Sequence, residues 1–364
     1  MLLLFFNVGD FIPNEKSRDI KIDDNALRKE ALSHGLAAIP AKWEDAKKIV
    51  DTPDNPLSFE KISLGRSLFF DPILSRDETI TCASCHLIQD GGDDNRPTAI
   101  GYHNQKNPKH LNSPTVLNAA LAKREFWDGR SPSVEDQAKG PIQAPFEMNM
   151  TPKEVIARVK QNELYAQTLK ELFPKTGVSF TNITKAIGAY ERTLLTRGSF
   201  DDFLDGNNSA ISLKAKKGLS LFINLGCKGC HTGMSVGGQS IQKFPLRRYD
   251  GFIIPISIFV NNHVQFSKFK FQSISKKTSP YPFKDTGGFH GKNGAFKFRV
   301  PILRNITRTT PYFHNGAVKE LKEVVRIMAK HQLGITLSKK QISQIIAFLK
   351  TLEGGPVDYD LAPD

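Results

Sequence analysis

Two short segments, Cys82-Ala-Ser-Cys-His86 and Cys227-Lys-Gly-Cys-His231, decide how this 364-residue sequence is understood. Each is a C-x-x-C pair followed at once by histidine, and together they contain all four cysteines of the chain. This pattern is the attachment signature of c-type haem: two thiols form thioethers with the haem, and the adjacent histidine binds the iron. The sequence therefore predicts two covalently bound haem c groups, with His86 and His231 as iron ligands.

Zinc binding is the main alternative for these cysteines. A zinc ion could take Cys82, Cys85, Cys227 and Cys230 together. That arrangement would leave two well-placed histidines unexplained, and a disulfide scaffold would need far more cysteine for this length. We therefore favour the two haems.

Similar sequences precede the two motifs. Gly65-Arg-Ser-Leu-Phe-Phe lies before the first, and Gly218-Leu-Ser-Leu-Phe-Ile lies before the second. Similar units this far apart favour duplicated domains over a solenoid. The chain length also suits two domains of roughly 150 residues each.

Helix signals dominate the periodic segments. Thr151-Pro152-Lys153-Glu154 is a capping box that predicts a helix ending before Pro174. Thr181 is expected to cap a helix through Leu195, and Ser212 one that runs into the second motif.

The last helix is predicted from a cap at Ser338 with Gln341. It carries one apolar stripe, which we expect to be core: Ile342, Ile345, Ile346, Leu349 and Leu352. Residues 91–114 and 236–299 have no helical period and are predicted to be irregular.

Composition limits the classes of protein. Hydrophobic residues make up 39% and charged residues 24%, which is ordinary for a folded soluble chain and excludes a disordered or collagen-like one. No apolar run approaches the ~18 residues of a membrane-spanning helix. The first six residues, MLLLFF, are shorter than a signal peptide, and we expect a truncated signal there. The net charge of +13 favours acidic partners, but the lysines form no long run, so nucleic acid is not expected.

Each haem iron has a second axial position. An open position allows peroxide chemistry, whereas a methionine gives an electron-transfer haem of raised potential. Met148 and Met150 follow the first motif, and Met328 ends a plausible helix after the second. Spacing alone does not distinguish whether Met328 is an iron ligand or a residue of the hydrophobic core.

Several further motifs make the chain resemble the bacterial dihaem cytochrome c peroxidases, from about residue 56 to about residue 355. Besides the two haem motifs, they are Asn112-Ser-Pro-Thr-Val-Leu-Asn118, Phe126-Trp-Asp-Gly-Arg130, Gln137-Ala-Lys-Gly-Pro141, Glu147-Met148 and Pro311-Tyr-Phe-His-Asn-Gly316. The resemblance implies a mainly α fold with two cytochrome c-like haem domains packed across a shared interface. We expect an extension over 1–50 holding a remnant signal and a leading helix. A peroxidatic domain over 51–210 and an electron-transfer domain over 211–364 follow, and the last helix can pack back on the first domain.

The resemblance also implies residue roles. His86 matches the proximal ligand of the peroxidatic haem, His231 that of the electron-transfer haem, and Met328 the distal ligand of the latter. Glu147 matches the catalytic acid/base and Gln137 its distal-pocket partner.

Two more roles follow from the same resemblance. Trp127 matches the tryptophan that lies between the haems, where it can carry electrons or simply fill the interface. Asn112, Thr309 and Pro311 match ligands of a calcium ion, a hard cation that takes oxygen donors.

The sequence departs from the family pattern in a loop. The family often has a histidine sixteen residues after the proximal ligand, and this histidine closes the peroxidatic haem in the oxidised state. Tyr102 occupies that position here, with His103 next to it. His103 is our preferred switching ligand; ligation by Tyr102, or no ligand at all, are the alternatives. The segment over 238–299 is also longer and more basic than usual, and is expected to shape the donor-docking face or the dimer contact.

The implied reaction is reduction of hydrogen peroxide to water with electrons from a small donor, a cytochrome c or a cupredoxin. The resemblance further implies a homodimer, and haem c attachment implies the periplasm. One alternative is a dihaem oxygenase of the methylamine dehydrogenase-maturing type, which has tyrosine where this chain has Met328. Another is a non-catalytic dihaem carrier or peroxide sensor, against which the Glu147/Gln137 pair argues.

Overall fold

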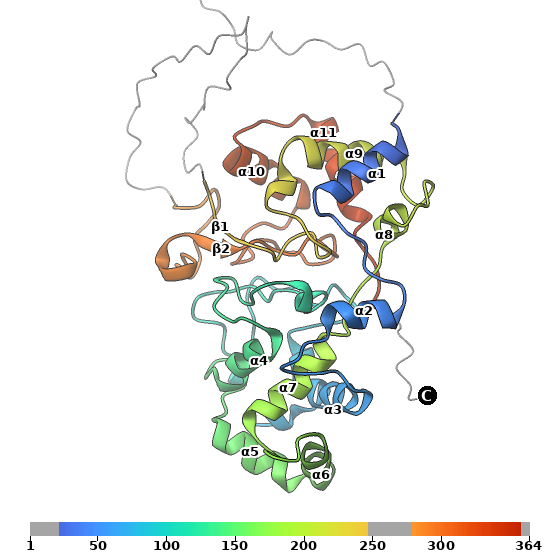
Figure 1. The fold of residues 1–364 in the computed structure, drawn as a ribbon. Helices are drawn as coiled ribbons and strands as arrows, with labels where there is room; N and C mark the ends of the chain where they lie inside the picture. The colour runs from blue at the N-terminus through green and yellow to red at the C-terminus, as the bar shows by residue number, and fades with distance from the viewer. Residues whose placement is uncertain (1–21, 247–278, 358–364) are drawn as a thin grey trace, which may run out of the picture.

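The computed structural model describes residues 22–246 and 279–357. Helices dominate, and the named strands form a single two-stranded sheet. Figure 1 shows the helices in an upper and a lower group joined by a narrower waist. The predicted mainly α fold is confirmed.

The lower group contains the first haem motif. Its helices are α2 (Trp43–Val50), α3 (Phe59–Phe70), α4 (Val134–Gln143), α5 (Pro152–Gln161), α6 (Glu163–Leu172) and α7 (Phe180–Glu191). Its centre is the crossing of α3 over α7, where Gly65 lies so close to α7 that a Cβ on it would come 1.9 Å from the carbonyl oxygen of Ala186. The apolar residues of these helices share one buried cluster with Leu117 and Met148.

The upper group contains the second motif. Its elements are α1 (Asp24–Ser33), α8 (Ser199–Leu204), α9 (Leu213–Asn224), α10 (Leu321–Met328), α11 (Lys339–Lys350), β1 (Ile241–Lys243) and β2 (Lys297–Arg299). Here α9 crosses α11 at Gly218, and a Cβ on Gly218 would come 1.9 Å from the carbonyl oxygen of Gln344. The internal repeat thus corresponds to two helix pairs that cross in the same way, each at a glycine.

The N-terminal region is divided between the two groups. Leu27 and Ala31 of α1 are buried with the upper cluster, whereas Ala46 and Val50 of α2 are buried with the lower one. Between them, Leu36 forms a parallel bridge to Gly233, next to the second haem motif. The leading helix is therefore a part of the upper core rather than an appendage.

The last helix, α11, packs on α9 and α10. Its apolar stripe is core as predicted, with Ile342, Ile345, Leu349 and Leu352 buried. The segment after α11, rather than the helix itself, returns toward the lower group: Val357 donates its backbone N–H to the carbonyl of Leu195 and contacts the lower cluster.

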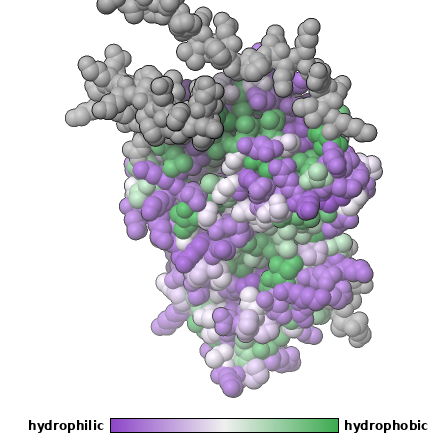
Figure 2. All heavy atoms as spheres, turned by 45° about the horizontal axis from the view of Figure 1, so that its top comes forward, coloured by the Kyte–Doolittle hydropathy of each residue, from purple (hydrophilic) through white to green (hydrophobic). Residues whose placement is uncertain are grey.

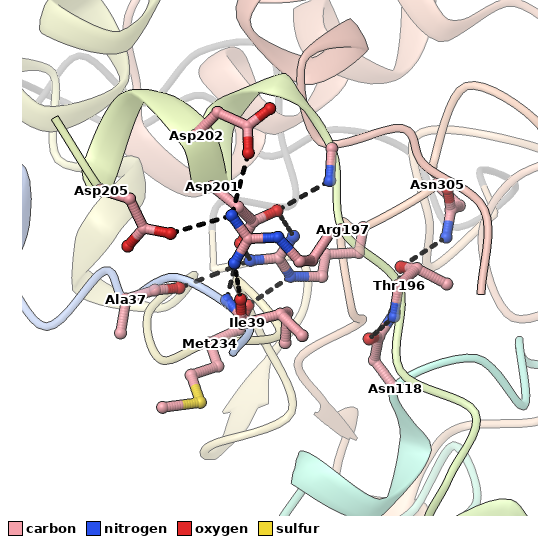
Figure 3. Close-up of polar contacts among 12 residues, drawn as sticks. Ala37, Ile39, Asn118, Thr196, Arg197, Asp201, Asp202, Asp205, Met234 and Asn305 are labelled. Atoms are coloured by element: carbon pink, nitrogen blue, oxygen red, sulfur yellow. Dashed lines mark hydrogen bonds and ion pairs between the residues drawn. The ribbon is translucent and has the colours of Figure 1, made fainter. Parts of the chain in front are cut away.

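Buried polar contacts hold the segments around α8, and Asn118 extends them toward the lower group (Figure 3). Asp201 accepts two hydrogen bonds of 2.7 Å from the guanidinium of Arg304, and both side chains are fully buried. Nearby, Thr196 Oγ1 accepts from the amides of Asn118 at 2.8 Å and Asn305 at 3.0 Å. Removing one partner of a buried ion pair leaves the other charge uncompensated and strongly destabilises a protein. Asp201 and Arg304 therefore each need the other in place.

Two predicted helix boundaries are wrong. The helix expected from 152 to 173 is interrupted at Asn162, whose side chain caps α6 by accepting from the backbone N–H of Tyr165. Ser179, rather than Thr181, caps α7. The caps at Thr151, Ser212 and Ser338 are confirmed.

The described parts of the segments expected to be irregular agree with the prediction, except for two short strands. Residues 91–114 contain only short turns. Of the segment over 238–299, β1 pairs antiparallel with β2, and residues 247–278 lie outside the described part, as does the MLLLFF stretch. Within the described residues, no helix is long and apolar enough to span a membrane. Figure 2 shows hydrophilic side chains over most of the visible face, with apolar patches in its upper half and about midway down.

Candidate active site

The first C-x-x-C-H segment opens onto a cavity of the lower group. Cys82, Cys85 and His86 line it. Thr81 caps the short helical turn of the cysteines by accepting from the backbone N–H of Ser84, and His86 Nδ1 lies 3.1 Å from the carbonyl oxygen of Gly92. A histidine whose Nδ1–H donates to a backbone carbonyl has its Nε2 free for a metal, as a haem ligand requires.

The second segment opens onto a separate cavity of the upper group. Cys227, Cys230 and His231 line it, and so does Met328. The remaining lining is largely apolar, including Phe222, Val325 and Leu349. Met328 ends α10 at the start of a single π-helical turn over Ala329–Leu333. The structure therefore brings His231 and Met328 to one cavity, although they are far apart in sequence.

The four thiols are suited to haem attachment and not to one shared metal. They form no disulfide, and the two pairs line different cavities. Burial raises the pKa of Cys85 to about 12 and that of Cys227 to about 11, so both are neutral thiols at pH 7. In the described residues, no three His, Cys, Asp or Glu side chains are placed to hold a metal ion. The four-cysteine zinc alternative is therefore wrong.

Glu147 and Gln137 line the first cavity together with His86. Gln137 lies on α4, whose cavity-facing residues also include Ala138 and Pro141. Glu147 follows α4 in a turn in which its N–H donates to the carbonyl of Ala144 at 3.0 Å. The helix and the turn after it thus bring an amide and a carboxyl to one cavity.

The backbone of Glu147 is held by the loop before it. The N–H of Tyr102 donates to the Glu147 carbonyl at 2.7 Å. A Cβ on Gly101 would lie 2.6 Å from the Glu147 Cα and 2.5 Å from the carbonyl oxygen of Phe146, so only glycine fits there. The position of Glu147 therefore depends on close contact with the 101–102 backbone.

The side chain of Glu147 has a partner that the sequence analysis missed. Asn107 Nδ2 donates to Glu147 Oε1 at 3.4 Å. Burial raises the pKa of Glu147, while the charge of Arg130 and the Asn107 hydrogen bond act in the opposite direction. A buried carboxyl of raised pKa that lines this cavity is equipped to accept and return a proton.

Trp127 lines both cavities. Its Nε1–H donates to the carbonyl of Asn112 at 2.8 Å, and its own carbonyl accepts from the N–H of Arg299 at 2.8 Å. Its ring lies edge-on to His314, with ring centres 6.4 Å apart. These contacts fix the indole between the two cavities.

The loop residues considered as a switching ligand lie elsewhere in this structure. His103 is exposed and stacks on Tyr102, with ring centres 3.9 Å apart. Neither side chain lines the first cavity. His103 has φ of +52°, a left-handed conformation that is uncommon outside glycine and typical of strained loops.

The expected calcium ligands gather where the two groups of helices meet. Thr309 and Pro311 line the upper cavity, as does Asn112. The side-chain nitrogen of Asn112, Nδ2, donates a hydrogen bond to the carbonyl of Arg96 at 2.6 Å. The side-chain oxygen, Oδ1, is left for another partner. The N–H of Asn112 donates to the carbonyl of His314 at 2.9 Å, which ties the first half to the second at this point.

Two acidic residues near this point were not anticipated. Both carboxylate oxygens of Asp93 and Oδ2 of Asp94 are buried without a hydrogen bond to any described residue. Burial, with the neighbouring Asp94 charge, raises the pKa of Asp93 to about 7. The preceding Gly91 is in contact with Thr309: a Cβ on it would lie 3.1 Å from Thr309 Cγ2. Buried carboxylate oxygens without hydrogen-bond donors are suited to bind a cation.

Comparisons with known proteins found a matching family profile, related sequences and a related solved structure. A family profile described as di-haem cytochrome c peroxidase matches residues 59–209. The cytochrome c551 peroxidase of Pseudomonas aeruginosa is 39% identical over 87% of this chain and 86% of its own length. The methylamine utilization protein MauG of Methylorubrum extorquens is 29% identical over 91% and 89%. Among solved structures, a MauG-like protein associated with microbial copper homeostasis has a TM-score of 0.65 and 26% identity, over 86% of this chain and 94% of that one.

Proposed function

Because this chain belongs to the di-haem cytochrome c peroxidase family, we propose that it reduces hydrogen peroxide to water in the first cavity with electrons received in the second. One observation carries the proposal. Each C-x-x-C-H segment has its own cavity, but only the first cavity contains Glu147 and Gln137, and only the second contains Met328.

The first cavity is proposed as the peroxide site. When bound there through Cys82, Cys85 and His86, haem c supplies the iron at which peroxide accepts electrons. Glu147 takes a proton from one peroxide oxygen at its carboxylate and returns it to the other, so that the departing oxygen leaves as water. Gln137 faces the same space and orients peroxide by its amide, while Asn107 holds Glu147 Oε1.

The second cavity is proposed as the electron-receiving site. Cys227 and Cys230 would hold the second haem, with His231 and Met328 as its axial ligands. A methionine ligand and a largely apolar lining both raise a haem potential. Electrons would then cross by Trp127, which lines both cavities.

Met328 also favours a peroxidase over the oxygenase alternative, because a thioether ligand suits electron transfer. The Glu147/Gln137 pair favours an enzyme over a carrier or sensor, because a carrier needs no acid/base group. Both alternatives predict little peroxide turnover with an external donor.

The experiment is steady-state peroxide turnover with a chemical donor, on fully oxidised and half-reduced protein, alongside haem spectra. We expect turnover in at least one form. Turnover only after one-electron reduction, with a new high-spin signal, would support a ligand switch by His103 or Tyr102. Turnover in the oxidised form would mean that no loop residue closes the first haem. No turnover in either form would contradict the peroxidase proposal.

We also propose a calcium ion held by Asn112 Oδ1 and the carbonyls of Thr309 and Pro311, with Asp93 and Asp94 supplying negative charge. Both carboxylate oxygens of Asp93 and Oδ2 of Asp94 are buried without a hydrogen bond to any described residue, which supports the site. Chelation should lower thermal stability, and more so at pH 8 than at pH 5. Because burial raises the pKa of Asp93 to about 7, its charge is largely absent at pH 5 and largely present at pH 8, where a bound cation would compensate it. Stability that ignores chelator and added calcium would contradict the site.

The donor, location and assembly are proposed on the family alone. We propose a small cytochrome c or cupredoxin as donor, a periplasmic location, and a homodimer. The net charge of +13 favours an acidic donor face, so the rate at limiting donor should fall as salt rises. A salt-independent rate would contradict that choice, and the mass in solution measures the dimer.

A further inference from the structure

Glu125 is a buried carboxyl group that the proposed mechanism does not use. It is 6% exposed and lies two residues before Trp127. It lines the first haem cavity, and it also lines a separate cavity of about 380 Å³ beside α4 and α7. This separate, outer cavity reaches solvent, since its lining includes the exposed residues Asp54 and Pro132. Glu125 is thus in contact with both an outer and an inner space.

Across the interface, Glu125 faces Arg299 of β2. Glu125 Oε2 lies 3.5 Å from Arg299 Nη1, and both side chains are at least nine-tenths buried. Arg299 Nη1 makes no hydrogen bond to the described residues, and Arg299 lines the upper haem cavity. The same residue donates its backbone N–H to Trp127. The charge pair therefore runs alongside Trp127, from one haem cavity to the other.

The other ionisable groups around Glu125 lie on α7 and α4. On α7, burial raises the pKa of Glu191 well above its usual value. On α4, Glu135 is held ionised by two hydrogen bonds from Arg192, of 2.8 and 3.0 Å, and its pKa is lowered. Asp136 and Lys139 face the outer cavity as an ion pair of 3.2 Å.

Glu125 is poised between its ionised and neutral forms near neutral pH. Burial raises its pKa to about 7, with the Arg299 charge opposing the shift. An electron that arrives nearby adds a negative charge to a region of low dielectric, and this raises the proton affinity of a neighbouring carboxylate.

Resting on the proposed function, we propose that Glu125 is a redox-linked proton site between the two haem cavities. When an electron reaches an adjacent haem, the Glu125 carboxylate takes one proton from solvent through the outer cavity and becomes a neutral acid. Reduction of H₂O₂ to two H₂O consumes two electrons and two protons from outside, and Glu125 supplies one of those protons and returns to the carboxylate.

The test is reduced-minus-oxidised infrared difference spectroscopy of the holoprotein near pH 7, together with haem potentials measured against pH. We expect a protonated-carboxyl band on reduction in the wild type, and this band should be lost in Glu125→Gln. At least one haem potential should fall with pH by up to about 59 mV per unit, which is one proton per electron, and should become flatter in the variant. Asp136→Asn removes a carboxylate from the outer cavity only, and it should keep both signals.

Glu125→Gln leaves Arg299 buried without its partner charge, so Glu125→Gln/Arg299→Gln is the second variant. It removes both charges and should also lack the band and the pH slope. A band and slope that persist in either variant would overturn the inference. That result would leave the peroxidase proposal intact if the wild type turns over peroxide in the same preparation, whereas a wild type without turnover would overturn the function instead.

Discussion

The two halves of this protein share a frame but differ in what lines their cavities. In both halves a glycine, Gly65 or Gly218, allows two helices to touch at their backbones, and a C-x-x-C-H segment follows. The first cavity then receives a carboxyl and an amide from residues 137–147, whereas the second receives aliphatic side chains and a methionine from α10. The comparison teaches that the scaffold fixes where a haem can sit, while the segment after each motif decides what that haem can do.

The largest effect should come from Glu147→Gln. It removes the proton acceptor of the first cavity while keeping its shape, so kcat for peroxide should fall by about 10²–10⁴-fold. The second haem should keep its potential. Glu171→Gln on the exposed part of α6 is the matched control and should behave as the wild type. Full activity in Glu147→Gln would contradict the role of this cavity.

Alanine at the two crossing glycines tests whether the halves share one frame. In either half a Cβ would come 1.9 Å from a backbone carbonyl, so the helices must separate. Gly65→Ala and Gly218→Ala should each lower the free energy of unfolding by about 1–3 kcal/mol or more. Gly355→Ala is the control, since nothing lies within 4 Å of its Cβ position. Denaturant unfolding measures all three, and a silent change in one half would show that the frames are not equivalent.

Met328→Ala should alter the second haem site and leave the first unchanged. Loss of the thioether should lower the potential of one haem and slow turnover at limiting donor by about tenfold. The reaction of pre-reduced protein with peroxide should stay at the wild-type rate. Spectroelectrochemistry measures the potential, and an unchanged high-potential couple would contradict the ligand assignment.

The smallest effect is expected from Asn107→Ala, which sharpens the account of the first cavity. The Asn107 hydrogen bond lowers the pKa of Glu147, so its removal should raise that pKa further. Glu147 must be ionised to accept a proton, and the rate falls as pH drops through its pKa. The acid limb of the pH–rate profile should therefore move to higher pH in the variant, and a limb that does not move would exclude this hydrogen bond as a tuning contact.

Much of this arrangement was predictable from local sequence. The haem motifs, the caps at Ser212 and Ser338, and the stripe on α11 depend on neighbouring residues, and the structure has them as expected. The cap at Asn162 was missed because a capping box at Thr151 and an apolar pattern through Leu172 outweigh a single asparagine.

What could not be predicted are contacts between segments distant in sequence. Asn107 on Glu147, Arg299 beside Glu125 and the unpartnered Asp93 have no local pattern, because each depends on how loops meet after the helices pack. Two adjacent aspartates directly after two glycines, Asp93 and Asp94, were the signal for the last.

The most direct test of this division between the halves is the single-turnover reaction of fully reduced protein with hydrogen peroxide, followed at both haems by rapid mixing. It separates the peroxide step from electron supply. The account predicts a wild-type rate for Met328→Ala and a rate lower by about 10²–10⁴-fold for Glu147→Gln. A slow Met328→Ala together with a fast Glu147→Gln would place peroxide chemistry in the second cavity and contradict the account.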